Sequence, residues 1–268
     1  MAAPSLTDIL RNNMREKLAR DEVVSSMTVR LVRSIEIARI AKTAGFDSLY
    51  IDMEHNSFSI DACSQICMAA AAIGIAPLVR VPANTPEWIS RVLDGGAVGV
   101  IAPHVRTADE ARGVVAAAKF PPLGERSANA GLPHLEYRSF PAAEANAALN
   151  EATIVMVQFE SAQAIESAEE IMAIEGVDMV MIGSNDLLAD MGLTGQYDHP
   201  KLNDAYQRTI AAAKKFGKHA GVGGVASRPD LVTRFVQMGA RYVSTGTDTA
   251  FLLSAATAKA KQVSDIKI

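Results

Sequence analysis

Short, mostly apolar runs alternate along the chain with longer segments in which apolar residues recur every three or four positions. The run at residues 46–51 is one example, because four to eight such residues bounded by turn signals are typical of a buried strand. The segment after it begins at Ser59, which can cap a helix, and places Ile60, Cys63 and Cys67 on one face. This pattern predicts strands and helices that alternate.

Continued along the whole chain, the pattern predicts eight strands, each followed by a helix. The strands are expected at residues 27–32, 46–51, 76–81, 98–102, 153–159, 179–182, 220–225 and 242–244. Their helices are expected at residues 35–43, from 59 onward, and at 86–93, 108–119, 162–174, 202–216, 229–238 and 250–262. Further helices are expected at 8–20 and 142–149, an irregular segment at 120–140, and a long loop at 183–199.

Eight strand-helix units imply that the strands pair in parallel through right-handed crossovers. The chain has 268 residues, which is a typical length for one barrel of this kind. The sequence therefore predicts an α/β fold with one domain over residues 1–268, a (β/α)8 TIM barrel with an extra N-terminal helix.

Composition and charge narrow the classes of function. The formal net charge is −4, so the chain lacks the basic footprint of a nucleic-acid-binding protein. No apolar stretch reaches the ~18 residues of a membrane span, and the first residues lack the basic segment and apolar core of a secretory signal. Cys63 and Cys67 are expected to be reduced core residues and not a metal site. A cytoplasmic protein with neither nucleic-acid nor membrane partners is expected.

Polar residues follow most of the predicted strands at the point where each strand ends. In a TIM barrel these ends meet at one face, and that face carries the chemistry. An arginine, two histidines and several acids therefore converge with smaller polar groups. In strand order these residues are Asp52, Glu54, His55, Arg80, His104, Gln158, Glu160, Ser184, Asn185, Asp186, Gly221–Gly224 and Thr245–Asp248.

Glu160 and Asp186 follow neighbouring strands, so their carboxylates can meet. Two carboxylates without thiols suit a hard divalent cation such as Mg²⁺ or Mn²⁺, and would leave positions open for water and substrate. The alternative makes Glu160 a first-turn acid of the next helix and Asp186 a turn residue. Arg80, in turn, could hold a substrate carboxylate, or could form a salt bridge with a neighbouring acid such as Glu54.

His55 is the natural candidate for proton transfer, because the unperturbed pKa of imidazole lies nearest neutrality. Asp94 could orient that ring, or could simply end its own helix. Alternatively, Asp52 and Glu54 cap the next helix and His55 is merely exposed. His104 is a second candidate base, which after Pro103 could instead only line the wall of the site.

Five separated motifs resemble those of the HpcH/HpaI aldolases, which are metal-dependent class II pyruvate aldolases. The resemblance runs from about Ala44 to Asp248, with the motifs in the same order and at similar spacing. The motifs are Asp52-x-Glu54-His55, Val79-Arg80-Val81-Pro82, Leu93-Asp94-x-Gly96-Ala97, Gln158-x-Glu160 and Ile182-Gly183-x-x-Asp186-Leu187.

The resemblance implies a role for each of these site residues. Glu160 and Asp186 would bind a divalent cation (Mg²⁺, Mn²⁺ or Co²⁺), and Arg80 would bind the pyruvyl carboxylate. His55 would act as acid and base with Asp94 as its partner. The expected contacts with substrate come from Arg80 together with three polar side chains, Gln158, Ser184 and Asn185.

The reaction that the resemblance implies is carbon–carbon cleavage of a 4-hydroxy-2-oxo acid. The products would be pyruvate (or hydroxypyruvate) and an aldehyde, formed through a metal-stabilised enolate. One alternative is a related lyase or decarboxylase acting on a substrate such as oxaloacetate. The other is a catalytically silent barrel that serves as a binding or assembly module.

Two further features bear on assembly and specificity. The resemblance implies a homohexamer, a trimer of dimers that exchange C-terminal helices, and Ala250–Ala260 could be such a helix or simply the barrel's eighth. Arg30 and Arg33 stand where such proteins usually carry tryptophan and glycine. They could recognise a second anionic group, or could be ordinary solvated charges. The loop at 124–131 also departs from the family pattern, so the identity of the aldehyde stays open.

Overall fold

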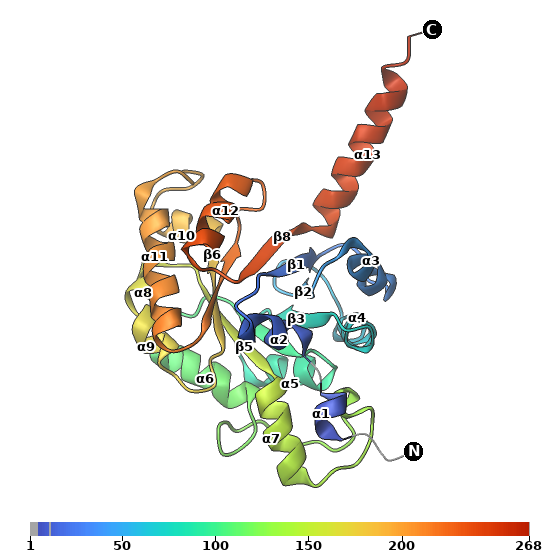
Figure 1. Ribbon diagram of the computed structural model, residues 1–268, viewed down its shortest axis with the longest axis vertical. Helices are drawn as coiled ribbons and strands as arrows, with labels where there is room; N and C mark the ends of the chain where they lie inside the picture. The colour runs from blue at the N-terminus through green and yellow to red at the C-terminus, as the bar shows by residue number, and fades with distance from the viewer. Residues whose placement is uncertain (1–4, 11, 268) are drawn as a thin grey trace.

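The computed structural model describes residues 5–10 and 12–267, and its centre is a closed barrel of eight parallel strands (Figure 1). Neighbouring strands pair in chain order, and the eighth strand pairs with the first. The expectation of an α/β TIM barrel is therefore confirmed. The strands are β1 (Val24–Val29), β2 (Ser48–Asp52), β3 (Ala76–Arg80), β4 (Gly99–Ala102), β5 (Ile154–Phe159), β6 (Met179–Gly183), β7 (His219–Gly223) and β8 (Tyr242–Thr247).

Helices follow the strands and cover the outside of the barrel, except that the last one projects away from it (Figure 1). Ser59 caps the second of them as expected, since its hydroxyl accepts a hydrogen bond from the backbone N–H of Ala62. The helices are α3 (Glu36–Ala44), α4 (Ile60–Ala72), α5 (Pro86–Asp94), α6 (Ala108–Ala118), α8 (Ala162–Glu166), α9 (Ala168–Met172), α11 (Pro200–Lys215), α12 (Pro229–Met238) and α13 (Asp248–Ser264). The additional Ala-rich helix, α7 (Ala142–Ala152), is longer than expected.

Five further segments differ from the expectation. Strand β1 begins and ends three residues earlier than expected, and β8 extends three residues further, to Thr247. The N-terminal helix is two helices, α1 (Leu6–Ile9) and α2 (Asn13–Ala19), because the side chain of Asn12 caps a new helix. The helix expected at 162–174 divides at Ser167 into α8 and α9. The loop expected at 183–199 begins with a helix, α10 (Ser184–Asp190). Its polar first turn looks like a loop in the sequence, but an acid in that position favours a helix N-terminus.

The period-two alternation of the strands sorts side chains between two apolar cores. Leu49 and Ile51 of β2 face outward and pack with the surrounding helices, whereas Tyr50 faces the barrel interior. Below Tyr50, Met14 and Leu18 of α2 are buried in the same interior cluster and close the N-terminal opening. Apolar side chains therefore fill the barrel interior at the N-terminal ends of the strands, whereas the inward positions at the C-terminal ends are polar.

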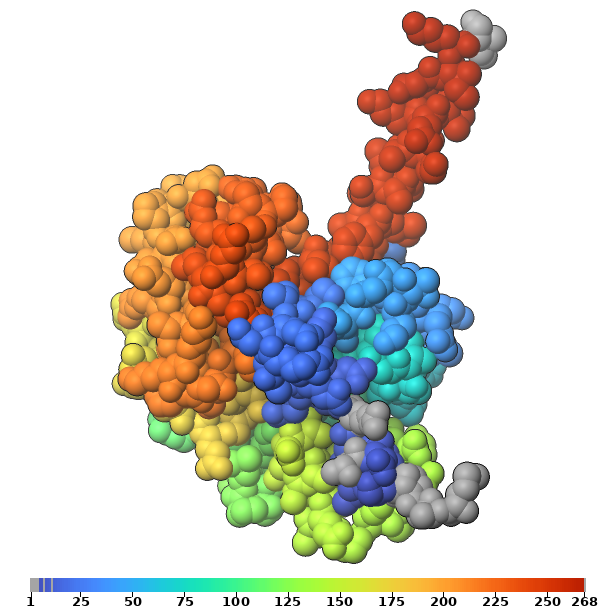
Figure 2. Space-filling model, viewed as in Figure 1, coloured from blue at the N-terminus to red at the C-terminus, as the bar shows by residue number. Residues whose placement is uncertain are grey.

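Asp248 anchors α13 to the loop that follows β1. Its carboxylate accepts hydrogen bonds from the backbone N–H groups of Arg30, Leu31 and Val32 at 2.8–2.9 Å. Beyond this anchor the helix stands clear of the barrel, as Figure 2 shows, and Asp248 is its one buried residue. No helix of the described residues is long and apolar enough to cross a bilayer.

We expect Asp248→Asn to lower the free energy of unfolding by roughly 2–4 kcal/mol, because the negative charge is lost and one of the two accepting oxygens becomes an NH₂ group, which cannot accept a backbone hydrogen bond. Urea unfolding followed by circular dichroism measures the loss. Asp265→Asn, at the exposed far end of α13, is the matched control and should change little. Equal stability of the two variants would show that the anchor contributes nothing.

Candidate active site

A cavity of 750 Å³ opens at the C-terminal ends of the strands, where the sequence predicts the chemistry. Eight of the polar residues that the sequence singles out line it, namely Arg30, His55, Arg80, Gln158, Asn185, Asp186, Thr245 and Thr247. A smaller and more apolar cavity of 350 Å³ lies against α1, α4 and α7, and none of the predicted site residues lines it. The larger cavity is therefore the candidate active site.

Asp52 is the centre of a buried network beside this cavity. It is fully buried at the end of β2 and accepts hydrogen bonds from Nε and Nη2 of Arg80 at 3.0 and 2.7 Å. A second guanidinium donates from Nε of Arg30 to Oδ2 at 2.6 Å. Burial would raise the pKa of Asp52, but the hydrogen bonds and charges of the two arginines outweigh it and lower the pKa. The carboxylate is thus held ionised between two cations.

The same carboxylate shapes the turn after β2. Its Oδ1 accepts from the backbone N–H groups of Glu54 and His55, and the backbone carbonyl of Asp52 accepts from the side-chain amide of Asn56. Glu54 then bonds to Nη1 of Arg80 at 2.8 Å. The salt bridge considered as the alternative role of Arg80 is therefore present. Arg80 nevertheless lines the cavity, so the salt bridge does not remove it from the candidate site.

Glu160 lies at the end of β5 with its carboxylate almost completely buried. Oε1 accepts from Nε2 of Gln158 at 2.6 Å, and Oε2 accepts from the backbone N–H of His104 at 2.9 Å. Burial raises the pKa of Glu160 to about 7, and the nearby charges of Asp186 and Glu54 act in the same direction against that of His104. The positive charge near this carboxylate is therefore too small to offset the effect of its burial.

These surroundings fit a hard divalent cation. The available donors are carboxylate oxygens together with Oε1 of Gln158, which is buried and has no hydrogen-bond partner in the described part of the chain. Gly183 leaves room for this arrangement, because a Cβ there would lie 2.7 Å from Oε1 of Glu160. Within residues 5–10 and 12–267 no three His, Cys, Asp or Glu side chains form a ready-made cage. Water and substrate would thus complete the coordination.

The two candidate histidines occupy different positions. His55 is half exposed at the rim of the cavity, with Nε2 3.7 Å from Oε2 of Glu54. His104 bridges two acids, since Nδ1 lies 2.9 Å from Glu160 and Nε2 2.9 Å from Glu54. Its φ of 55° is unusual for a residue other than glycine and aims its N–H at Glu160. The sequence singles out His104 by its position at the end of the fourth strand, but it does not indicate these contacts with two acids.

Two predicted site residues lie apart from the cavity. Asp94, at the end of α5, pairs with Nη2 of Arg126 at 2.6 Å, and the described residues include no contact between Asp94 and His55. Ser184 is fully buried and hydrogen bonds with the hydroxyl of Tyr206 and the carbonyl of Gly223. Neighbouring groups of the chain satisfy both side chains, and within the described residues Asp94 therefore does not orient His55.

Comparisons with known proteins agree with this geometry. The family model for the HpcH/HpaI aldolase/citrate lyase family matches residues 31–255. The chain is 35% identical to the 4-hydroxy-4-methyl-2-oxoglutarate aldolase tasA of Hapsidospora irregularis over 260 residues, which is 96% of each chain. It is 34% identical over 241 residues to the 2-keto-3-deoxy-L-rhamnonate aldolase of Escherichia coli O157:H7, covering 90% of this chain and 89% of that one.

Solved structures extend the likeness to three dimensions. The HpcH/HpaI aldolase of Desulfitobacterium hafniense DCB-2 superposes with a TM-score of 0.88 at 30% identity, covering 94% of this chain and 97% of that one. A family protein from Burkholderia cenocepacia J2315 gives 0.85 at 29% identity, covering 95% and 100%. The resemblance of the five motifs is thereby confirmed, and the chain belongs to the HpcH/HpaI aldolase/citrate lyase family.

Proposed function

We propose that the protein is a divalent-metal-dependent class II pyruvate aldolase. It cleaves a 4-hydroxy-2-oxo acid into pyruvate, or hydroxypyruvate, and a carbonyl fragment, and it catalyses the reverse condensation. The observation that carries the proposal is the cavity lined by Arg80, His55 and Asp186, next to the buried Glu160, whose carboxylate accepts a hydrogen bond from the lining residue Gln158. The names of the relatives, which are aldolases of 2-oxo acids, support the same substrate class.

Glu160 and Asp186 would hold the cation, and Gln158 would orient Glu160 through its 2.6 Å hydrogen bond. When bound, the cation supplies Lewis-acid stabilisation of the charge that develops on the ketone oxygen of the 2-oxo acid. Mg²⁺, Mn²⁺ and Co²⁺ all accept oxygen donors of this kind. This chemistry needs no lysine imine, which agrees with the lack of a lysine among the residues that line the cavity.

Arg80 binds the carboxylate of the 2-oxo acid. Asp52 accepts one N–H from Nε and one from Nη2, and Glu54 forms an ion pair with Nη1, so each terminal nitrogen keeps an N–H for the substrate. Asp52 also fixes the plane of the guanidinium, so little side-chain freedom is lost when substrate binds. His55 moves the proton on the C4 hydroxyl, directly or through one water molecule, because its ring stands at the rim where the carbonyl fragment leaves.

A catalytically silent barrel is the less economical explanation. Burying ionised groups costs several kcal/mol per ion in proteins, and a purely structural barrel has no need for them at its mouth. A decarboxylase acting on oxaloacetate would use the same residues. Pyruvate release measured with oxaloacetate and with 4-hydroxy-2-oxo acids distinguishes the decarboxylase from the aldolase.

α13 is the basis for proposing a homo-oligomer. Its apolar side chains are exposed, with Leu252 at 60%, Leu253 at 65% and Val263 at 69%, and no part of the described chain covers them. We propose that a second copy of the chain does so, in a hexamer built as a trimer of dimers. Exposed apolar surface of this kind commonly marks an interface.

We also propose that the protein works in the cytoplasm. Cys63 and Cys67 are both free and buried on α4, and burial raises the pKa of Cys67 well above its ordinary value. Such thiols behave as packing residues, which suits a reducing compartment.

Glu160→Gln should weaken Mn²⁺ binding at least about 100-fold and lower pyruvate release about 10³-fold, because the amide keeps the shape but loses the charge. Electron paramagnetic resonance titration of Mn²⁺ and a coupled pyruvate assay measure the two effects. Glu170→Gln, at an exposed glutamate of α9, is the control. Unchanged pyruvate release in Glu160→Gln, or in wild type with excess chelator, would refute the metal mechanism.

His55→Ala should lower kcat by about 10²–10⁴-fold and leave Mn²⁺ binding unchanged, because the ring transfers protons and holds no cation ligand. His104→Ala should instead alter Mn²⁺ binding, since it removes a direct contact with Glu160. Steady-state kinetics and the Mn²⁺ titration distinguish the two variants. Near-normal kcat in His55→Ala together with a large loss in His104→Ala would move the proton transfer to His104.

Leu253→Lys should shift the molar mass in solution toward that of a single chain, because a charged side chain is costly in an apolar interface. Light scattering after size-exclusion chromatography measures the mass. Lys259→Glu, a charge change in the same exposed helix, tests whether charge alone disrupts assembly. A single-chain mass for the wild type would contradict the proposed oligomer.

A further inference from the structure

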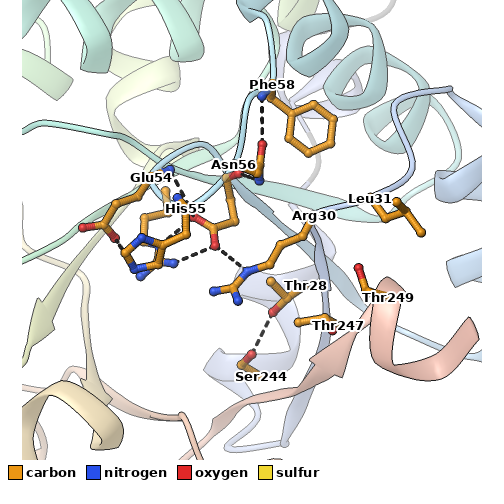
Figure 3. A network of polar contacts seen from close by, with 12 residues as sticks. Thr28, Arg30, Leu31, Glu54, His55, Asn56, Phe58, Ser244, Thr247 and Thr249 are labelled. Atoms are coloured by element: carbon orange, nitrogen blue, oxygen red, sulfur yellow. Dashed lines mark hydrogen bonds and ion pairs between the residues drawn. The ribbon is translucent and has the colours of Figure 1, made fainter. Parts of the chain in front are cut away.

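A second arginine faces the cavity and has more free hydrogen-bonding capacity than Arg80. Arg30 follows β1, and its side chain lines the cavity beside Thr28 and is 40% exposed (Figure 3). Only its Nε is engaged, by Asp52, and in residues 5–10 and 12–267 no acid pairs with its terminal nitrogens. Two terminal NH₂ groups are therefore available to a ligand.

Hydroxyl groups surround this arginine on the cavity wall. Thr28 and Ser244 hydrogen bond with each other at 2.9 Å across the β1–β8 pairing, and Thr247 lies near them (Figure 3). Thr245 lines the same wall. Hydroxyls and a guanidinium fork together form a good environment for a carboxylate, since both donate hydrogen bonds and the fork adds charge.

The position of Arg30 is fixed before any ligand arrives. The backbone N–H of Arg30 donates a hydrogen bond to Asp248 at 2.9 Å, and its Nε donates one to Asp52 at 2.6 Å. The guanidinium groups of Arg30 and Arg80 are adjacent, because both donate to Oδ2 of Asp52. Two neighbouring, preorganised cations suit a short diacid better than a monoacid with an uncharged tail.

We propose that Arg30, with the hydroxyls of Thr28, Ser244 and Thr247, binds a second carboxylate on the substrate. The first carboxylate, next to the ketone, binds Arg80. The inference rests on the proposed aldolase function and sharpens it, because it selects 4-hydroxy-2-oxo acids whose carbonyl fragment is itself anionic. Substrates that yield a neutral aldehyde, including polyhydroxylated ones, leave Arg30 without a charged partner.

The test compares two five-carbon 2-oxo acids that differ only at C5. 2-Oxoglutarate has a carboxylate there and 2-oxopentanoate has a methyl group. Calorimetric titration of the Mn²⁺-loaded, full-length protein should show at least about tenfold tighter binding of the diacid. Arg30→Met should bring the two affinities within about twofold, and Arg30→Lys should retain part of the difference.

Arg33→Met is the matched control. Arg33 belongs to the same loop, but it bonds to the hydroxyl of Ser57 and lies over the ring of Phe58, outside the cavity lining. Its removal should leave the preference for the diacid unchanged. Added salt should reduce the preference in wild type, because screening weakens a partly exposed charge pair.

The outcomes separate the inference from the proposed function. Equal weakening of both acids by Arg30→Met would show that Arg30 only supports Asp52, and equal binding by wild type would refute the subsite directly. Neither readout requires turnover. A wild type that prefers the diacid but releases no pyruvate from any 4-hydroxy-2-oxo acid would refute the aldolase and leave the subsite standing.

Discussion

One buried carboxylate organises the mouth of the barrel. Asp52 binds the guanidinium groups of Arg80 and Arg30 and also accepts from the backbone after β2. Strands β1, β2 and β3 thereby share a single ionic centre. Removing one partner from such a buried set typically costs about 3–5 kcal/mol, because an uncompensated charge remains. The positions of both arginines, and of the turn that carries His55, depend on this acid.

The barrel interior supports that centre by being apolar below it. Tyr50 of β2 lies one inward position beneath Asp52, and its ring lies 5.4 Å from the guanidinium carbon of Arg80. The apolar layer excludes water from one side of the ion pairs, which strengthens their attraction. On the opposite side of the barrel mouth, burial raises the pKa of Glu160 to about 7. The same end of the barrel therefore holds one carboxylate between two cations, Asp52, and one without enough positive charge nearby, Glu160.

The alternation of apolar runs with helix-like segments made most of this architecture predictable from the sequence. The apolar run at residues 46–51 identified β2, and the polar groups after successive strands located the cavity. The sequence could not reveal α10, because its first turn is polar like a loop. Nor could it reveal the pairing of Asp94 with Arg126 or the burial of Ser184, since both depend on contacts between distant segments. The backbone N–H of His104 reaches Glu160 only because the residue adopts a left-handed φ, which no sequence motif indicates.

The pairing of β1 with β8 also has a consequence for biosynthesis. The loop that carries Arg30 is anchored by Asp248, which lies 218 residues later in the chain. A ribosome must therefore release nearly all of the barrel before its first strand finds its final neighbour. Contacts of such long range make folding slow, and a nascent chain stalled before β8 keeps an open sheet edge that chaperones must shield.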